Sequence, residues 1–326
     1  MDTMILKTVR TVVSVHVLAL SSMAAWAQDY PWKAITLVVG YPAGGSVDLV
    51  ARAIAPGLSR RLGQPVNVEN IPGTSGALAA ARVALADPDG HTLLLGSPAE
   101  VGINHLVSRR RDGYNPLKDS TPLGLIGSQP LVLVASKKTP VASIDEFLLA
   151  TAQSPDAMRY ASSGMGTPLH LAGETIRQQS GVRMVHVPSR GAGAMLAHLD
   201  SGDVDFAVMV LSSALPHIKD GKLKAIGVTK LERSAAAPQI QALAENARFK
   251  GVDAGVWFGL LGPGKLPPAT TTRLRENLQQ LLRDPELRKT LEAAGLTMMD
   301  GTDFAPFLQA EIQKFRRVVE FASIRN

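Results

Sequence analysis

Two glycine-bearing turns, each followed by a helical pattern, are the part of this sequence best suited to chemistry. The first runs Gly40-Tyr41-Pro42-Ala43-Gly44-Gly45-Ser46-Val47-Asp48, and the second spans residues 160–170. A turn between a strand end and a helix start directs free backbone N–H groups and the positive end of a helix dipole at one point. Each turn therefore predicts a site for a small anion such as a carboxylate, and the pair predicts two lobes holding one ligand between them.

The first turn has the residues that close backbone contact requires. Gly44 and Gly45 allow a sharp turn and let a ligand approach the main chain. Ser46 can either cap the following helix or donate to the ligand, and both possibilities stay open here. Asp48 lies in the first helical turn, where a carboxylate suits the dipole, so we expect it to hold the loop and not to touch an anion.

The second turn repeats the pattern with hydroxyl side chains. Pro168 at the first helical position has no N–H, so donors must come from the backbone of Gly166, Thr167 and Leu169 or from side chains. The candidate hydroxyls are those of Ser162, Ser163 and Thr167. The alternative is an ordinary turn whose caps satisfy themselves. His170, three residues after Thr167, is expected to brace the turn.

The first 27 residues have the features of an export signal. Lys7 and Arg10 precede the mostly apolar stretch 11–25, and Ala25-Trp26-Ala27 has the small-x-small form of a cleavage site. The alternative, a membrane anchor, is disfavoured because the apolar stretch is short for a bilayer. We expect a mature, soluble, monomeric chain that begins near Gln28 in the periplasm.

Composition narrows the function classes. The chain has no cysteine, which excludes disulfides, thiolate metal sites and cysteine nucleophiles. Its formal net charge is +6, its densest basic run is 109–111 beside Asp112, and only 5% of residues are aromatic, so we expect no nucleic-acid partner. No metal-binding spacing, serine-hydrolase elbow or phosphate-binding loop occurs. We therefore expect no metal, no cofactor and no enzymatic activity.

Strand and helix patterns alternate along the chain, which is typical of an α/β fold built from parallel βαβ units. Strands are predicted at 35–39, 66–69, 92–95, 131–135, 182–187, 204–210, 223–228 and 256–261. Helices are predicted at 48–61, 77–86, 143–153, 168–178, 192–199 and 269–282, with one capped by Asp284 and a last one capped by Thr302.

Two apolar runs, 130–134 and 256–261, are interpreted as the crossings between lobes. The first lobe then comprises residues 28–130 and 253–326, and the second comprises 131–252.

The order of the motifs resembles the Bug family, the periplasmic solute-binding receptors of tripartite tricarboxylate transporters. The resemblance covers the whole mature chain and rests on Tyr41–Asp48, Glu69–Gly73, Asp87–Leu94, Tyr160–Gly164, Gly166-Thr167, His170–Glu174, His186–Pro188, Ser213–Lys219 and Trp257–Leu261. It implies a type II periplasmic-binding-protein fold with two α/β lobes, each a mixed, mostly parallel sheet flanked by helices. It also implies a small carboxylate ligand and, as partners, the permease subunits in the membrane.

The resemblance adds further positions to the ligand site. It places Tyr41 and Ala43 there with the rest of the first turn, and it adds Ser97, Ala99, Ser189, Arg190, Gly191 and Met209. Arg190 is either a solvated loop charge or a clamp on a distal carboxylate. Met209 stands where many members have an acidic residue, so a ligand with an ammonium group is disfavoured. An apolar or aromatic acid, or a plain dicarboxylate, fits better.

Two other functions stay open at this point. The chain could report its ligand to a sensor kinase instead of feeding a transporter, and the sequence does not separate these. An exported α/β enzyme would need a serine bonded to a histidine that a carboxylate orients.

Overall fold

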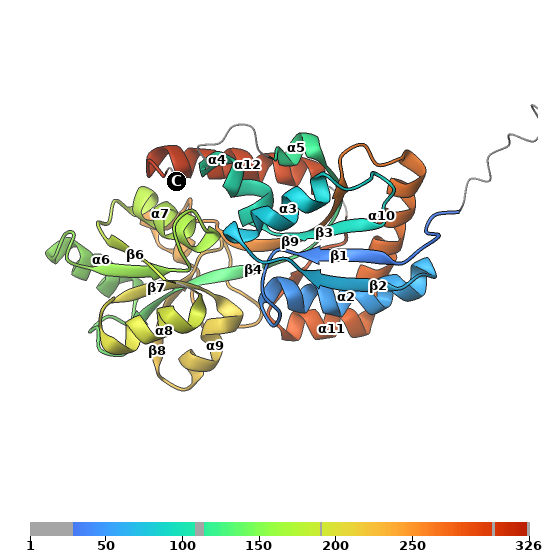
Figure 1. Ribbon diagram of the computed structural model, residues 1–326. Helices are drawn as coiled ribbons and strands as arrows, with labels where there is room; N and C mark the ends of the chain where they lie inside the picture. Colours follow the sequence, from blue (N-terminus) through green and yellow to red (C-terminus); the bar gives the residue numbers. More distant parts are fainter. Residues whose placement is uncertain (1–28, 108–113, 190, 302–303, 325–326) are drawn as a thin grey trace, which may run out of the picture.

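The computed structural model describes residues 29–107, 114–189, 191–301 and 304–324. The predicted export signal, the basic run 109–111, Arg190 and the predicted cap Thr302 lie outside the described residues. The chain forms two α/β lobes side by side, with the blue and orange segments in one lobe and the green and yellow segments in the other (Figure 1). Within the described part, no helix has both the length and the apolarity that a membrane crossing requires.

The first lobe is built on β1 (Ile35–Val39), β2 (Val66–Asn70), β3 (Thr92–Gly96) and β9 (Gly255–Pro263), in the order β2-β1-β3-β9. β1 pairs in parallel with β2 and β3, whereas β9 runs antiparallel to β3. The first lobe's helices are α2 (Ser46–Leu62), η1 (Thr74–Gly76), α3 (Ala77–Ala84), η2 (Ala99–Ile103), α4 (Asn104–Val107), α5 (Pro116–Asp119), α10 (Pro268–Leu282) and α11 (Pro285–Ala293).

The second lobe is built on β5 (Arg159–Ser162), β6 (Val185–Pro188), β7 (Phe206–Val210) and β8 (Leu223–Val228). β5 pairs in parallel with β6 and β7. Its helical segments are α6 (Ile144–Gln153), α7 (Pro168–Ser180), α8 (Ala192–Ser201), α9 (Leu211–Lys219), η3 (Leu243–Glu245) and η4 (Ala247–Phe249).

One long strand, β4 (Ser120–Ser136), belongs to both sheets. Its first part pairs antiparallel with β9 as far as Pro130 opposite Gly255, and with the short β10 (Thr297–Met298). From Leu131 onward it pairs antiparallel with β7 and β8. The strand is almost entirely buried, because each face is covered by helices of one lobe or the other. The boundaries 130/131 and 252/253 between lobes stay a prediction.

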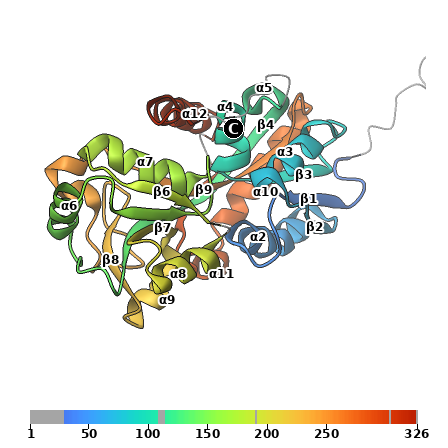
Figure 2. The same ribbon diagram turned by 60° about the vertical axis from the view of Figure 1, so that its left-hand side comes forward.

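The last helix, α12 (Phe304–Phe321), lies along the side of the molecule where the two lobes meet (Figures 1 and 2). Its residues Phe315, Val318 and Val319 form an apolar cluster with Ile103 of η2 and Leu171 of α7. The helix therefore contacts an element of each lobe.

Most predicted elements occur within two residues of their predicted ends. Three differences stand out, and two of them have a clear physical reason. β4 begins at Ser120 rather than at residue 131, because its first half pairs with β9 despite containing two prolines and two glycines. β6 begins at Val185, three residues late. α9 was not predicted, because Pro216 interrupts its apolar pattern.

Candidate ligand-binding site

A cavity of about 630 Å³ lies between the lobes. Its walls come from the loop after β1, from η1 and the loop after β3 in the first lobe, and from the loops after β5, β6 and β7 in the second. Among the described residues, no side chain lining it is charged. Within this described lining, a ligand's charge would be met by dipoles and hydrogen bonds.

Among the described elements, four α-helices begin at this cavity. Its lining includes Ser46 and Val47 at the start of α2, Leu169 near the start of α7, Ala192 at the start of α8, and Val210 before α9. The first N–H groups of a helix have no intrahelical acceptor, and the dipole adds partial positive charge there. The helices α2, α8 and α9 also have no side-chain cap, so their first N–H groups are not satisfied by their own cap residues. This arrangement suits an anion.

The side chain of Asp48 holds the first turn in place through hydrogen bonds. Its side chain is 1% exposed and accepts hydrogen bonds from the Gly44 N–H (2.8 Å), from Arg52 Nε (2.9 Å) and from Asn70 Nδ2 (2.9 Å). Burial alone would raise the pKa of Asp48, but these hydrogen bonds outweigh it and the pKa is lowered. Asp48 therefore anchors the loop, as its position predicts. Ser46 is the first residue of α2 and Gly45 is its N-cap, so Ser46 does not cap the helix.

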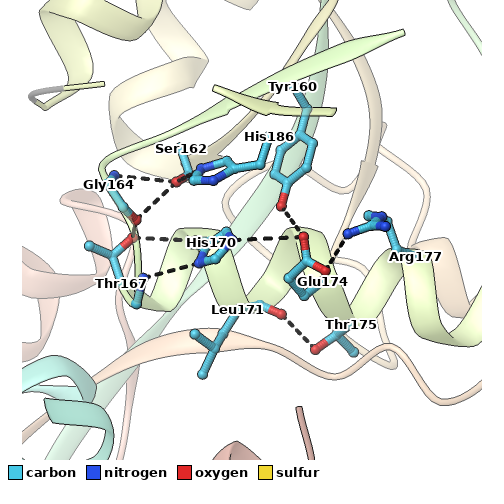
Figure 3. A network of polar contacts seen from close by, with 11 residues as sticks. Tyr160, Ser162, Gly164, Thr167, His170, Leu171, Glu174, Thr175, Arg177 and His186 are labelled. Atoms are coloured by element: carbon cyan, nitrogen blue, oxygen red, sulfur yellow. Dashed lines mark hydrogen bonds and ion pairs between the residues drawn. The ribbon is translucent and has the colours of Figure 1, made fainter. Parts of the chain in front are cut away.

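The polar groups of the second turn bond mainly to one another (Figure 3). The Gly166 N–H donates to His170 Nδ1 (3.0 Å), and the Thr167 hydroxyl donates to the Gly164 carbonyl (2.8 Å). The Ser163 hydroxyl donates to Thr167 Oγ1 (3.1 Å). His170 braces the turn, as predicted. The Leu169 N–H is at the second position of α7, where it has no acceptor within the helix, so it remains as a donor for a ligand.

A buried polar network supports this turn from behind. Glu174 accepts from the Tyr160 hydroxyl (2.6 Å) and from Arg177 (2.6 Å), and its Oε1 lies 3.7 Å from His170 Nε2 (Figure 3). The His170 and His186 rings stack 4.0 Å apart. Burial, with smaller contributions from His170 and Arg177, lowers the pKa of His186 to about 3, so this ring is neutral near pH 7.

Two serine–histidine contacts occur near the cavity. Ser162 Oγ lies 2.7 Å from His186 Nε2, and Ser189 Oγ lies 3.0 Å from His198 Nδ1. In the part of the chain that the structure describes, no carboxylate bonds to either histidine, and Ser162 is fully buried. The arrangement lacks the third group that orients a catalytic base.

A buried carboxylate that the sequence patterns did not single out lies behind the first turn. Glu100, 1% exposed, accepts from the Tyr41 hydroxyl (2.7 Å), the Ser97 hydroxyl (2.7 Å) and the Ser97 N–H (2.6 Å). Burial raises the pKa of Glu100 to about 7, although these hydrogen bonds act in the opposite direction. The sequence gives only a weak signal for Glu100, because many acidic residues that follow the end of a strand are exposed and not buried.

The part of the cavity in the second lobe is largely apolar. Met195, Met209 and Val210 line it together with Leu169 and with Val256 of β9. The sequence singled out Met209 and the backbone of Leu169, whereas Met195, Val210 and Val256 have the pattern of ordinary core residues. Together they form a wall that suits hydrocarbon and not a second charge.

The structure brings most of the predicted site residues together at the cavity. Those that line it are Tyr41, Ala43, Gly45, Ser46, Ser97, Ala99, Ser163, Thr167, Gly191 and Met209. Four others are not part of the lining: the Gly44 N–H bonds to Asp48, the Gly166 N–H to His170, and the Ser162 and Ser189 side chains to histidines. Arg190 lies outside the described residues. Contact of these residues with a ligand stays a prediction.

Comparison with known proteins assigns the chain to a family. The model of the tripartite tricarboxylate transporter family receptor, TctC, matches residues 50–324. Protein BugT of Bordetella pertussis is 30% identical over 298 residues, covering 90% of each chain. An uncharacterised-family protein encoded between tcbD and tcbE in Pseudomonas sp. strain P51 is 30% identical over 315 residues, covering 95% of this chain and 93% of that protein.

Solved structures agree with this assignment. A Rhodopseudomonas palustris protein solved with adipate superposes with a TM-score of 0.81 at 30% identity, covering 91% of this chain and 99% of that one. MatC of the same organism, with bound malate, gives 0.76 at 31% identity, covering 89% and 100%. The protein therefore belongs to the TctC family of periplasmic solute receptors, and its fold is the two-lobed type II fold that the resemblance implied.

Proposed function

We propose that this protein captures a small organic carboxylate between its lobes in the periplasm and delivers it to the permease subunits of a tripartite tricarboxylate transporter. The proposal is carried by one observation: a cavity without charged side chains in the described residues, at which four helices begin. Relatives of the same fold were solved with adipate and with malate, which are both dicarboxylates. The chain acts as a receptor and not as an enzyme, and its residues 1–27 are an export signal cleaved near Ala27.

The ligand's carboxylate is held at the first turn by the N–H groups of Ser46 and Val47 and at the second lobe by those of Leu169 and Ala192. Hydrogen bonds to a charged group contribute about 1.5–3 kcal/mol each. Three or four of them, less the costs of desolvation and ordering, are enough for roughly micromolar affinity. The rest of the ligand lies against Met195 and Met209. This favours an acid with an apolar chain or ring over an amino acid.

The first experiment is a thermal-shift screen of the protein purified from the periplasm, against mono-, di- and tricarboxylates, amino acids and sugars. The proposal expects a rise in melting temperature with at least one carboxylate that carries no ammonium group. A rise only with sugars or amino acids would overturn it.

The chain offers a sharp test of the backbone donor. Ser46 is at the first helical position of α2, where proline is well tolerated, and Gly45 before it has φ −75° and ψ 167°, which a following proline allows. Ser46→Pro removes the N–H and the hydroxyl, whereas Ser46→Ala removes the hydroxyl alone. We expect Ser46→Pro to weaken carboxylate binding about 10- to 100-fold relative to Ser46→Ala. Equal affinities would show that this N–H does not hold the ligand.

A further inference from the structure

Glu100 lies one layer behind the cavity wall, with two hydroxyls between it and the ligand space. The Tyr41 and Ser97 side chains line the cavity, and both hydroxyls contact Glu100 Oε2 at 2.7 Å. The two hydroxyl oxygens are themselves 3.1 Å apart, and the Tyr41 hydroxyl also lies 3.4 Å from the carbonyl oxygen of Ser75, another residue of the cavity lining. The three oxygens therefore form a closed triangle in which each can exchange a hydrogen bond with the other two.

The charge of Glu100 decides the direction of those hydrogen bonds. An ionised carboxylate only accepts, so both hydroxyl protons point at Oε2 and the cavity faces hydroxyl lone pairs. A ligand carboxylate would meet these lone pairs and, behind them, a second negative charge. In this state the Tyr41 and Ser97 hydroxyls cannot donate to an anion.

Protonation of Glu100 reverses this arrangement. The protonated Oε2 donates to the hydroxyl of Ser97 or Tyr41, so one hydroxyl proton is released from Glu100 and can turn toward the cavity. The Ser97 N–H can continue to donate to Oε1. One proton taken up by Glu100 thus removes a buried negative charge and gives the cavity one new donor.

Apart from its three hydrogen bonds, little around Glu100 favours the ionised form. The titratable side chains Tyr41 and Tyr114 interact with it, and burial raises the pKa of both hydroxyls, so neither is charged near pH 7. Of the elements packed against η2, η1 has no charged residue, and α3 carries Arg82. On α4, burial lowers the pKa of His105, and the positive charge of the nearby Arg316 lowers it further.

Two charged residues of α12, Glu311 and Lys314, have other partners. Glu311 bonds to Trp257 Nε1 (3.2 Å) and to Lys314 Nζ (3.3 Å), and Lys314 also reaches Asp253. No cation in the described residues pairs with Glu100, which agrees with the upward shift of its pKa by burial.

We propose that Glu100 is a positioning residue that sets the hydrogen-bond polarity of Tyr41 and Ser97, and that the receptor takes up one proton at Glu100 when it binds a carboxylate. The inference rests on the proposed function, since it requires an anionic ligand in this cavity. Under this proposal, the affinity for the anion declines as the pH rises through the range in which Glu100 of the ligand-free receptor ionises.

The test is isothermal titration calorimetry of the full mature protein with adipate, malate and benzoate between pH 6.5 and 9, where these acids are ionised. Repeating each titration in two buffers with different ionisation enthalpies gives the number of protons taken up. For the tightest of the three acids, we expect nearly one proton per ligand at pH 8 and up to a tenfold loss of affinity per pH unit above 7.

Glu100→Gln is the informative variant, because the Gln carbonyl can accept from the Ser97 N–H while its amide donates to the hydroxyls, as a protonated Glu would. We expect it to bind as tightly as wild type at pH 6.5, to bind more tightly at pH 9, and to take up no proton. Glu311→Gln is the matched control, a partly buried acid outside the cavity, and should keep the wild-type pH dependence.

The outcomes separate this inference from the proposed function. Tight binding with no proton uptake and no difference in pH dependence between wild type and Glu100→Gln would overturn the role of Glu100 and leave the receptor function standing. A Glu100→Gln protein that binds weakly at every pH would mark a merely structural role and would also overturn it. Folded wild-type protein that binds none of the carboxylates, in calorimetry or in the thermal-shift screen, would overturn both.

Discussion

The backbone N–H of Gly166 donates to Nδ1 of His170 across 3.0 Å, so the second glycine turn is tied to the helix that it starts. The bond requires His170 Nδ1 to be unprotonated. Burial lowers the pKa of His170, although Glu174 acts to raise it, and the ring is therefore neutral near pH 7. The turn has a fixed shape before any ligand arrives.

Replacing His170 should show how much this brace contributes. His170→Ala leaves the buried Gly166 N–H without an acceptor, which costs about 1–3 kcal/mol of unfolding free energy. His170→Asn places an amide oxygen near the former Nδ1 position and should recover part of that loss. Urea denaturation of the three proteins checks this. Equal stability of the Ala and Asn variants would show that the Gly166 bond is not the cause.

Glu100 should make stability depend on pH in a direction unusual for a carboxyl group. Its pKa rises from 4.5 to about 7 on folding, so the folded state favours the protonated form. The stabilisation is fully present below pH 4.5 and is lost as the pH rises through about 7, by about 3 kcal/mol if the whole shift is realised. Comparing wild type with Glu100→Gln in urea at pH 5 and pH 8 isolates it, because His170 and His186 titrate alike in both. A constant difference between the two proteins would contradict this.

The buried ring of Tyr160 packs directly against Gly173 of α7, so a larger residue at position 173 should clash with it. A Cβ added to Gly173 on α7 would lie 2.3 Å from Cε2 of the buried Tyr160 ring. Gly173→Ala should therefore displace the ring and its hydrogen bond to Glu174, at a cost of about 1–3 kcal/mol, despite the higher helix propensity of alanine. Gly193→Ala on α8, where a Cβ meets nothing within 4 Å, is the control. Thermal denaturation of both variants checks the difference.

The residue at position 209 should determine whether the second-lobe half of the cavity tolerates a negatively charged group of the ligand. Met209→Asp places a carboxylate in a cavity whose described lining has no cation to pair with it. Two like charges about 5 Å apart at an effective dielectric constant of about 20 repel by about 3 kcal/mol, so binding of adipate should weaken roughly 100-fold. Met209→Gln, polar but neutral, should weaken it much less. Calorimetry distinguishes the two, and equal losses would assign the effect to shape alone.

The sequence predicts those parts of the site that depend on local backbone rules. Thr167, Pro168 and Asp284 mark helix starts by side chain and position, and Asp48 is placed under its turn by the same logic. These features involve residues only a few positions apart, so periodicity and capping chemistry reveal them.

The rest of the site depends on contacts between distant segments. Tyr41 and Glu100 are brought together by the parallel pairing of β1 with β3, and Val256 reaches the cavity only because β9 returns from the second lobe. Ser162 is a predicted ligand residue, and the sequence does not reveal that β6 places His186 beside it. Such placements follow from strand order, which no short motif encodes.

The passage of β4 through both sheets has a thermodynamic consequence. Its ladder with β9 continues to Pro130, and its ladder with β7 begins at Leu131, so no unpaired linker separates the lobes along this strand. Unfolding the sheet of either lobe would remove hydrogen bonds from β4, a strand that also belongs to the sheet of the other lobe. We therefore expect heat to unfold the protein in a single cooperative transition, with equal calorimetric and van't Hoff enthalpies, although it is built from two lobes.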